Sequence, residues 1–428
     1  AYFTALIQRV VGKSIPQCEG EVTTVMKFLE NFCSDNVRQL ARGFNLPGDH
    51  AGQQTSGYRF PFGGVSLITP FNFALEIPGI QLMSALYMGN RPIVKVDSKV
   101  QVVCEQFVRM LHHAGLPKED LDFLYSDGPV MNEVIVKGKS RMCLFTGSQG
   151  VAEKLVHDLN GRIKLEDAGF DYKILGPDVP AQGSKNYDFA VWQSDQDAYG
   201  FSGQKCSAQS ILFAHKNWVE RGFLDDIKER ASRRNLDDMT LGPVLSWTTA
   251  AMVEQINACV QAHPGAKILF GGNPLQNHSI PERYGALEPT AISMPIEALE
   301  DPAIFELATQ EVFGPVQVVV EYGDDAHNDI DVVLRHCNNL ENHLTAGVVS
   351  NNPQFIQHVL ERTINGTTYV GWRARTTGAP QQMWFGPSGD PLSAGIHTKE
   401  AIQLCWSSHR EIFQDFALVP DSWEPVMS

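Results

Sequence analysis

Short β-rich runs alternate with helical stretches through the first half of the chain, and this alternation limits the possible folds more than any other feature. A strand is predicted at 65–69, where Pro70 stops it, and an apolar helix follows at 77–88. That helix should end at Gly89-Asn90, because glycine readily takes the left-handed conformation that closes a helix. The pattern then repeats, with strands at 92–96 and 142–145 and helices at 100–113 and 151–159. Such alternation predicts βαβ units, and therefore an α/β fold with a parallel sheet covered on both faces.

A second α/β pattern occupies residues 169–395, with a predicted helix at 251–262 and a predicted strand at 317–322. A chain of 428 residues is too long for one ordinary core, so two or three domains are expected. Two segments fit neither pattern: residues 43–62, which are rich in Gly and Pro, and the tail from residue 411.

Charge and apolar patterning argue against two classes of partner. The net charge is −15, and an acidic surface repels phosphate backbones, so no nucleic-acid partner is expected. No apolar run is long enough to span a bilayer, so no membrane partner is expected either. The first ten residues contain neither Met nor a basic leader and read as the middle of a helix. We therefore expect the natural N-terminus, with any targeting segment, to precede residue 1.

The cysteine and histidine spacing predicts no metal site. The eight cysteines are scattered and include no C-x-x-C pair. This spacing favours a reducing compartment and argues against a disulfide framework or a zinc ribbon. The adjacent His112 and His113 also lack the spacing of metal ligands, and we expect them to end a helix instead.

Cys206 carries the strongest chemical signal in the chain, in the run Phe201-Ser202-Gly203-Gln204-Lys205-Cys206-Ser207-Ala208-Gln209-Ser210. A lone cysteine is most often a small buried hydrophobe. Here the flanking residues are polar and include glycine, which is unlike a core segment and favours a nucleophile. Only the thiolate attacks a carbonyl, and we expect Lys205 to favour that charged form. A helix beginning directly after Cys206 would add the effect of its dipole.

Other positions carry weaker signals. Gly147-Ser148 follow a strand and precede a helix, where backbone N–H groups attract phosphate. The G-x-G-x-x-G fingerprint of dinucleotide binding is absent, however. Taken alone, Lys95 is most simply a solvated lysine, Asn72 a turn residue and Glu166 a surface acid. Glu311 is an acidic residue that precedes an apolar turn. Taken separately, none of these residues identifies a site.

Taken together and in this order, the motifs resemble the aldehyde dehydrogenase family over nearly the whole chain. The matching elements are Ile68-Thr69-Pro70-Phe71-Asn72-Phe73, Gly89-Asn90, Lys95, Phe145-Thr146-Gly147-Ser148, Leu165-Glu166, Gly203-Gln204-Lys205-Cys206 and Glu311-Val312-Phe313-Gly314-Pro315. A narrower set resembles the plant-type pyrroline-5-carboxylate dehydrogenase branch. It comprises the runs 165–171, 203–210, 365–369 and 375–380.

The resemblance implies a catalytic role for three residues. Cys206 would attack the aldehyde to give a thiohemiacetal, and loss of hydride would leave a thioester. The side chain of Asn72 and the backbone N–H of Cys206 would form the oxyanion hole. Glu166 would act as the general base that activates water for hydrolysis of the thioester.

The resemblance also implies the residues that bind cofactor and substrate. Glu311 and Phe313 would hold the nicotinamide ribose and ring, Lys95 the adenosine ribose and Ser148 the pyrophosphate. The residues expected on the cofactor side are Ile68, Thr69, Pro70, Phe71, Lys95, Ser98, Gly128, Gly147, Ser148, Glu311 and Phe313. Ser207 and the loop at Ala394-Gly395 would hold the α-carboxylate of the substrate, with Phe73 and Lys205 nearby.

Three departures from the family pattern bear on these expectations. NAD is the expected cofactor, but NADP stays open, because Ser98 stands where many members have a Glu that binds ribose hydroxyls. Ala152 replaces a second glycine after Gly147, which changes packing only slightly. The usual glycine-rich substrate loop reads Leu392-Ser393-Ala394-Gly395-Ile396-His397 here, which bears on substrate affinity.

The implied architecture has three parts. A Rossmann-like cofactor domain would cover 1–42 and 62–168, and an α/β catalytic domain 169–395. A small β oligomerisation flap would combine 43–61 with the return segment 396–428 and pair with another subunit in a dimer or a dimer of dimers. By resemblance the location would be the mitochondrial matrix, with the cytoplasm as the alternative.

The implied function is oxidation of L-glutamate-γ-semialdehyde, formed from pyrroline-5-carboxylate, to glutamate in proline catabolism. Two alternatives stay open. The enzyme could act on another semialdehyde or an aliphatic aldehyde, or the chain could be a truncated, inactive member that serves only as a binding or oligomerisation partner. Transfer to coenzyme A is disfavoured, because Glu166 is in place to activate water.

Overall fold

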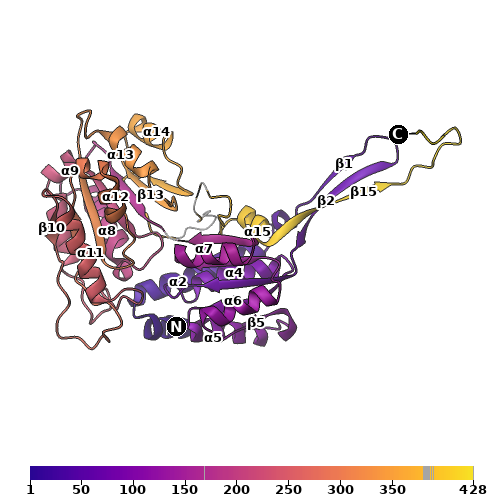
Figure 1. Cartoon of the computed structure of the whole chain (residues 1–428), viewed down its shortest axis with the longest axis horizontal. Coiled ribbons are helices and arrows are strands. Elements are labelled where there is room, and N and C mark those ends of the chain that lie inside the picture. The colour runs from indigo at the N-terminus through magenta and orange to yellow at the C-terminus, as the bar shows by residue number, and fades with distance from the viewer. Residues whose placement is uncertain (168, 379–385, 387, 389, 428) are drawn as a thin grey trace.

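The computed structural model describes residues 1–167, 169–378, 386, 388 and 390–427. Its described strands form a five-stranded sheet, a seven-stranded sheet and a three-stranded sheet. Figure 1 shows the first two as separate layers of a central body, from which the third extends to one side. No helix in the described part of the chain is both long and apolar enough to cross a bilayer.

The five-stranded sheet is parallel throughout and has the order β5-β4-β3-β6-β7. Val65, Leu67 and Val94 are fully buried, as expected for strands covered by helices on both faces. The strands are β3 (Gly64–Thr69), β4 (Arg91–Val96), β5 (Asp122–Phe123), β6 (Cys143–Gly147) and β7 (Ile163–Asp167), and the connecting helices are α4 (Glu76–Tyr87), α5 (Gln101–His113), α6 (Gly128–Lys137) and α7 (Gln149–Asp158). The predicted strand–helix alternation is confirmed to within about two residues at each end.

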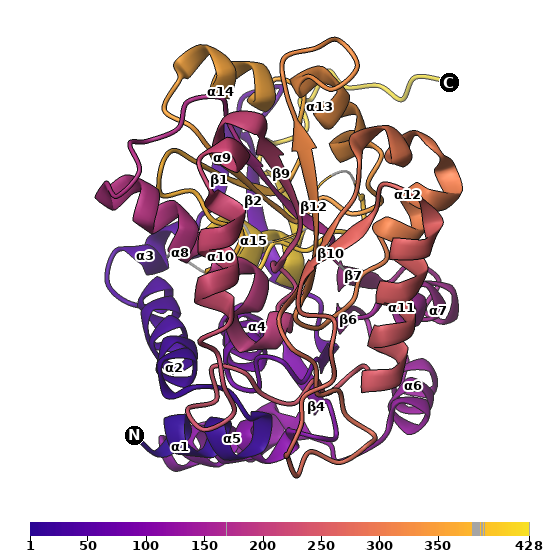
Figure 2. The ribbon, with the colours of Figure 1, turned by 90° about the vertical axis from the view of Figure 1, so that its left-hand side faces the viewer.

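The seven-stranded sheet has the order β10-β11-β12-β9-β8-β13-β14 and is parallel except for its edge strand β10. Its strands are β8 (Asp171–Leu175), β9 (Gln209–His215), β10 (Lys267–Phe270), β11 (Thr290–Ser293), β12 (Val316–Tyr322), β13 (Thr345–Val349) and β14 (Thr367–Val370). The helices are α8 (Lys185–Tyr199), α9 (Lys216–Glu220), α10 (Phe223–Ala231), α11 (Thr249–Ala262), α12 (Pro302–Ala308), α13 (Ile330–Asn338) and α14 (Pro353–Leu360). Figure 2 shows α8–α10 and α11–α12 on opposite faces of this sheet.

The two segments that fit neither pattern come together in the third sheet. β2 (Gln53–Pro61) pairs in antiparallel fashion with β1 (Phe44–Pro47) and with β15 (Ser407–Asp415). β15 directly follows the helix α15 (Lys399–Trp406), so it lies within the predicted return segment 396–428 and begins four residues before the tail at 411. The sheet stands clear of the body in Figure 1 and exposes Phe60 and Phe413.

The division into domains remains a proposal. Strands β3–β7 lie within the cofactor domain predicted at 62–168, and β8–β14 lie within 169–395. Three N-terminal helices, α1 (Tyr2–Val11), α2 (Ile15–Leu29) and α3 (Asn36–Leu40), precede the first strand. The core of the five-stranded sheet includes side chains from α1 and α2, and it also includes Phe201 and Leu245 from the second pattern.

Candidate active site

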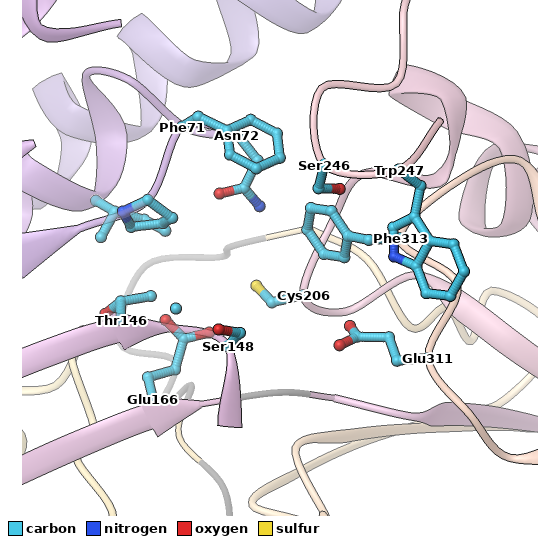
Figure 3. A pocket seen from close by; sticks show the side chains of 13 residues that line it. Phe71, Asn72, Thr146, Ser148, Glu166, Cys206, Ser246, Trp247, Glu311 and Phe313 are labelled. Atoms are coloured by element: carbon cyan, nitrogen blue, oxygen red, sulfur yellow. The ribbon is translucent and has the colours of Figure 1, made fainter. Parts of the chain in front are cut away.

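Cys206 lines a cavity of about 260 Å³ between the two large sheets. Residues from both α/β patterns meet there: Asn72 and Ser148 from the first, Glu311 and Phe313 from the second. Figure 3 shows the thiol in the middle, with the amide of Asn72 on one side and the carboxyl of Glu166 on the other. The structure thus brings together the three residues expected to carry the chemistry.

The segment leading to Cys206 is held in an unusual backbone conformation. After α8 the chain takes positive φ angles at Phe201 (58°), Ser202 (52°) and Gly203 (69°). A Cβ at Gly203 would lie 2.0 Å from the carbonyl oxygen of Gly314, so only glycine permits this close approach. The contact places the 311–314 segment directly beside the Cys206 loop.

Two expectations about Cys206 are wrong. A strand follows the residue, since β9 begins at Gln209, so no helix dipole acts on the thiol. Lys205 is buried, and its ammonium points toward Gly200, where an added Cβ would lie 3.3 Å from Nζ. Burial lowers the pKa of Lys205 to about 8. Consecutive residues in a turn point in different directions, so proximity in sequence did not bring the ammonium to the sulfur.

The surroundings of Cys206 instead favour the neutral thiol. Burial raises its pKa well above the ordinary value, and the nearby carboxylates of Glu166, Asp171 and Glu311 raise it further. Attack on a carbonyl therefore requires a base beside the sulfur that can take the proton.

Glu166 is in position to be that base. It lies on β7 at the edge of the five-stranded sheet, and burial raises the pKa of its carboxyl to about 7 despite opposing interactions with Cys206 and Thr146. Gly169 permits the close approach of this segment to the nucleophile, because a Cβ there would lie 2.2 Å from the carbonyl oxygen of Cys206. A carboxyl with a pKa near 7 can both accept and release a proton near neutral pH.

Asn72 lies in the link between β3 and α4 and is almost completely buried. Its Nδ2 donates to the backbone oxygen of Gln204 at 3.2 Å. Gln204 is itself fixed, since its Oε1 accepts from the N–H of Leu245 at 2.7 Å and its Nε2 donates to Pro243 at 2.9 Å. The second N–H of the Asn72 amide can therefore serve an oxyanion at Cys206.

Several cofactor-side residues surround the same cavity. Pro70 and Phe71 follow Ile68 and Thr69 at the end of β3, and the Phe71 and Phe313 rings meet edge to face at 5.9 Å. Gly147 ends β6, and Ser148 precedes the first turn of α7, which has no side-chain cap. Burial raises the pKa of Glu311 to about 8.

Five predicted cofactor residues are not among those that line this cavity: Ile68 and Thr69, which lie on β3, and Lys95, Ser98 and Gly128. Lys95 is buried near the end of β4, and burial lowers its pKa, so it is not the solvated lysine of the ordinary reading. Ser98 is exposed in the following turn, and Gly128 is exposed at the start of α6. Their roles stay predictions.

A second cavity, of about 380 Å³, adjoins Cys206 on its other side. Phe73, Lys205 and Ser207 line it, as predicted for the substrate side. Ala394 and Gly395 are not among its lining residues, whereas the next two residues, Ile396 and His397, are. The N–H of Ala394 already donates to the backbone oxygen of Leu165 at 2.8 Å, so it is not the free donor that was expected.

The comparison with known proteins identifies the family. The model of the aldehyde dehydrogenase family matches residues 1–389. The chain belongs to this family. Three residues of the runs 165–171 and 375–380, namely Ala168, Ala379 and Pro380, lie outside the described residues.

Individual aldehyde dehydrogenases agree with this placement. The chain is 57% identical over 424 residues to delta-1-pyrroline-5-carboxylate dehydrogenase 12A1, mitochondrial, of Arabidopsis thaliana, covering 99% of this chain and 75% of that protein. It is 26% identical over 417 residues to 1-pyrroline-5-carboxylate dehydrogenase 1 of Halalkalibacterium halodurans, and the match covers 93% of this chain and 74% of that protein. The solved structure of aldehyde dehydrogenase 21 of Physcomitrella patens has the same fold, with a TM-score of 0.81 and 19% identity. The match covers 98% of this chain and 83% of that one. The expected aldehyde dehydrogenase fold is therefore confirmed.

Sequence reasoning did not single out every residue of this aldehyde dehydrogenase site. Glu76 and Arg375 line the second cavity, and Trp247 lines the first. Glu76 follows the Phe71-Asn72-Phe73 motif, and Arg375 opens the 375–380 run, so both lay within reach of the motif comparison. Trp247 carries no comparable signal, because it comes from a loop with no motif of its own.

Proposed function

We propose that this aldehyde dehydrogenase oxidises L-glutamate-γ-semialdehyde, the open form of pyrroline-5-carboxylate, to glutamate with NAD as the oxidant. The 57% identity to the Arabidopsis enzyme over nearly the whole chain is the observation that carries the proposal. The place of this reaction in metabolism is proline catabolism. The cysteine, amide and carboxyl that meet in the cavity support a thioester route.

The proposed route uses three residues of the chain in sequence. Glu166 takes the proton of the neutral Cys206 thiol, and the sulfur attacks the aldehyde carbon. The amide of Asn72 and the backbone N–H of Cys206 stabilise the resulting oxyanion. Loss of hydride, for which a bound NAD would be the acceptor, converts the thiohemiacetal into a thioester. Glu166 releases the thiol proton to solvent and then takes a proton from the water whose oxygen attacks the thioester. It returns that proton to the leaving sulfur as glutamate departs, which restores the thiol.

The residues on the cofactor side fit a nicotinamide dinucleotide. The apolar walls formed by Phe71, Phe313 and Trp247 suit a flat ring. The uncapped N-terminus of α7 at Ser148 offers backbone N–H groups to a pyrophosphate. Lys95, on the neighbouring strand β4, would hold the adenosine ribose.

We expect NAD to be preferred over NADP by about tenfold or more in kcat/KM, because a 2′-phosphate needs a free cation. The nearest candidate, Lys99, is engaged: its Nζ lies 3.4 Å from Asp97 and 5.2 Å from the centre of the Phe71 ring. Steady-state rates with each cofactor measure the ratio. Ser98→Glu should raise it, since a carboxylate binds ribose hydroxyls and repels phosphate. A wild-type preference for NADP would contradict this assignment.

The second cavity offers groups that match an amino-acid head. Ser207 is a neutral donor, Arg375 a cation for an α-carboxylate, and Glu76 an anion for an α-ammonium. Burial raises the pKa of Glu76 to about 8, and a bound ammonium would favour its charged form. The loop of Arg375 is anchored by Asp197, which accepts from the N–H of Thr376 at 2.9 Å.

The proposed substrate predicts strong selectivity. We expect kcat/KM for glutamate semialdehyde to exceed that for propanal and hexanal by about a hundredfold or more, because an empty head pocket leaves buried polar groups unpaired. Ser207→Ala should lower the value for the semialdehyde selectively and narrow the gap. Ser210→Ala is the matched control, since Ser210 lines a different cavity. Equal efficiency with propanal would favour the aliphatic alternative and overturn the proposed substrate.

Assembly and location are part of the same proposal. The sheet of β1, β2 and β15 exposes Phe44, Phe60 and Phe413 on a strand surface that another subunit could cover. We propose a homo-oligomer, a dimer or a dimer of dimers, in the mitochondrial matrix, in line with the name of the Arabidopsis relative. Sedimentation equilibrium tests the assembly, and a monomer at micromolar concentration would contradict it.

A further inference from the structure

Lys13 is a buried cation for which the route above has no use. It follows Gly12, the residue that ends α1, and its Nζ lies 2.5 Å from Oε2 of Glu21 on α2. The two side chains are 1% and 0% exposed. Burying two charges costs desolvation energy, so such a pair is weak evidence for stability by itself. The contacts that the two side chains make with other residues are therefore more informative than the pair itself.

Both partners bind the link that carries Asn72. The Lys13 ammonium donates to the backbone oxygen of Asn72 at 3.1 Å. The other carboxylate oxygen of Glu21, Oε1, accepts from the N–H of Leu75 at 2.6 Å and from that of Glu76 at 3.0 Å. Hydrogen bonds to charged groups are stronger than neutral ones. The ion pair thus holds the link in its middle, at Asn72, and at its end, where Leu75 meets the start of α4.

The same ammonium also touches the loop that leads to the nucleophile. Its Nζ lies 4.6 Å from the centre of the Phe73 ring and 4.8 Å from the centre of the Phe201 ring. Phe201 begins the run of positive φ angles that ends at Gly203. Gly12, the residue before Lys13, packs against the loop that contains Gly242, since a Cβ at Gly242 would lie 2.2 Å from the carbonyl oxygen of Gly12. Ser202 is tied to that loop by its Oγ, which accepts from the N–H of Gly242 at 2.8 Å.

We propose that Lys13, paired with Glu21, is a positioning residue that sets the Asn72 amide at its working distance from Cys206. The inference rests on the proposed function, because it concerns the oxyanion donor of the same site. Lys13 binds the backbone of Asn72, which supplies one oxyanion donor. Through the Phe201 ring it also contacts the segment that leads to Cys206, which supplies the other donor. A donor displaced by about an ångström loses much of its effect on the developing charge, so loss of the cation should slow acylation.

An activated ester tests this role without depending on the natural aldehyde. With p-nitrophenyl acetate, the Cys206 sulfur attacks the carbonyl, the acetyl group moves to sulfur, p-nitrophenolate leaves and the thiol proton passes to Glu166. The reaction needs the same oxyanion donors, and the release of nitrophenolate reports acylation directly. Failure of the semialdehyde assay would overturn the proposed substrate and leave this readout intact.

The double variant Lys13→Met/Glu21→Gln removes both buried charges together and so avoids leaving one unpaired. We expect it to acylate about 10- to 100-fold more slowly, with the Kd for NAD within about twofold of wild type. The matched control is Arg234→Met/Asp195→Asn, which removes another buried pair, 2.6 Å apart, whose hydrogen bonds within the described part of the chain go to residues outside the Asn72 link. Acylation by the control should stay within about threefold of wild type.

A double-mutant cycle separates positioning from general damage. Asn72→Ala alone should slow acylation about 100-fold, and adding Lys13→Met/Glu21→Gln should then have little further effect. If the double variant does not fold, Lys13→Arg keeps the charge but changes the geometry, and acylation should still fall several-fold. Unchanged acylation in a folded Lys13 variant, or a full additional loss in the Asn72→Ala background, would overturn the proposal.

Discussion

Replacing Cys206 by alanine is expected to lower dehydrogenase turnover by at least about a thousandfold, because among the described residues that line the cavity between the sheets it is the only thiol. NAD binding should be retained, since the cofactor-side walls are formed by other residues. Turnover with pyrroline-5-carboxylate and a thermal shift with NAD measure the two effects separately.

Two other cysteines serve as controls for Cys206. Cys33 is exposed and Cys143 is buried, with burial raising the pKa of its thiol to about 12. Cys33→Ala and Cys143→Ala should each keep most of the wild-type activity. Turnover retained in Cys206→Ala would remove the nucleophile from the account and with it the thioester route.

Replacing Glu166 by glutamine should slow hydrolysis of the thioester by about a hundredfold or more, because an amide cannot take a proton from water. Attack by Cys206 should slow less, because water entering the cavity can take the thiol proton in place of Glu166, and the change removes a negative charge that raises the pKa of the thiol. Rapid mixing with substrate and NAD should therefore show a burst of NADH followed by a slow steady phase.

Two further measurements test the role of Glu166: the pH dependence of thioester hydrolysis in the wild type, and a substitution of the neighbouring acid Asp167. Glu166 works as a base only when deprotonated, and its pKa is raised to about 7, so wild-type hydrolysis should rise with pH through 7 and then level off. Asp167→Asn changes the next residue of β7, and its progress curves should resemble those of the wild type. A Glu166→Gln variant whose first turnover is as slow as the later ones would place Glu166 in another role.

Much of the fold followed from local patterning. The alternation at 65–159 predicted a parallel sheet and three of its strands, β3, β4 and β6, because buried strands and amphipathic helices have different periods. The motif order then supplied the cavity partners of Cys206. No strand was predicted within the return segment 396–428, since nothing in the sequence marks where α15 gives way to the extended chain of β15.

The misses arose where side-chain direction or distant backbone contacts decide. Lys205 was expected to face the thiol, but the left-handed run ending at Gly203 sets the turn so that it points toward Gly200. Ala394 was expected to donate to the substrate, but its N–H is taken by Leu165 on β7. The first depends on the backbone conformation of the turn and the second on a contact between residues far apart in sequence, so no periodicity could reveal either.

The most direct test of the central claim is mass analysis of the Glu166→Gln variant, quenched in acid after mixing with pyrroline-5-carboxylate and NAD. The account predicts a γ-glutamyl thioester on the peptide that carries Cys206, in an amount equal to the NADH burst. NADH formed without that adduct, or an adduct on another cysteine, would contradict the proposed substrate, nucleophile and base together.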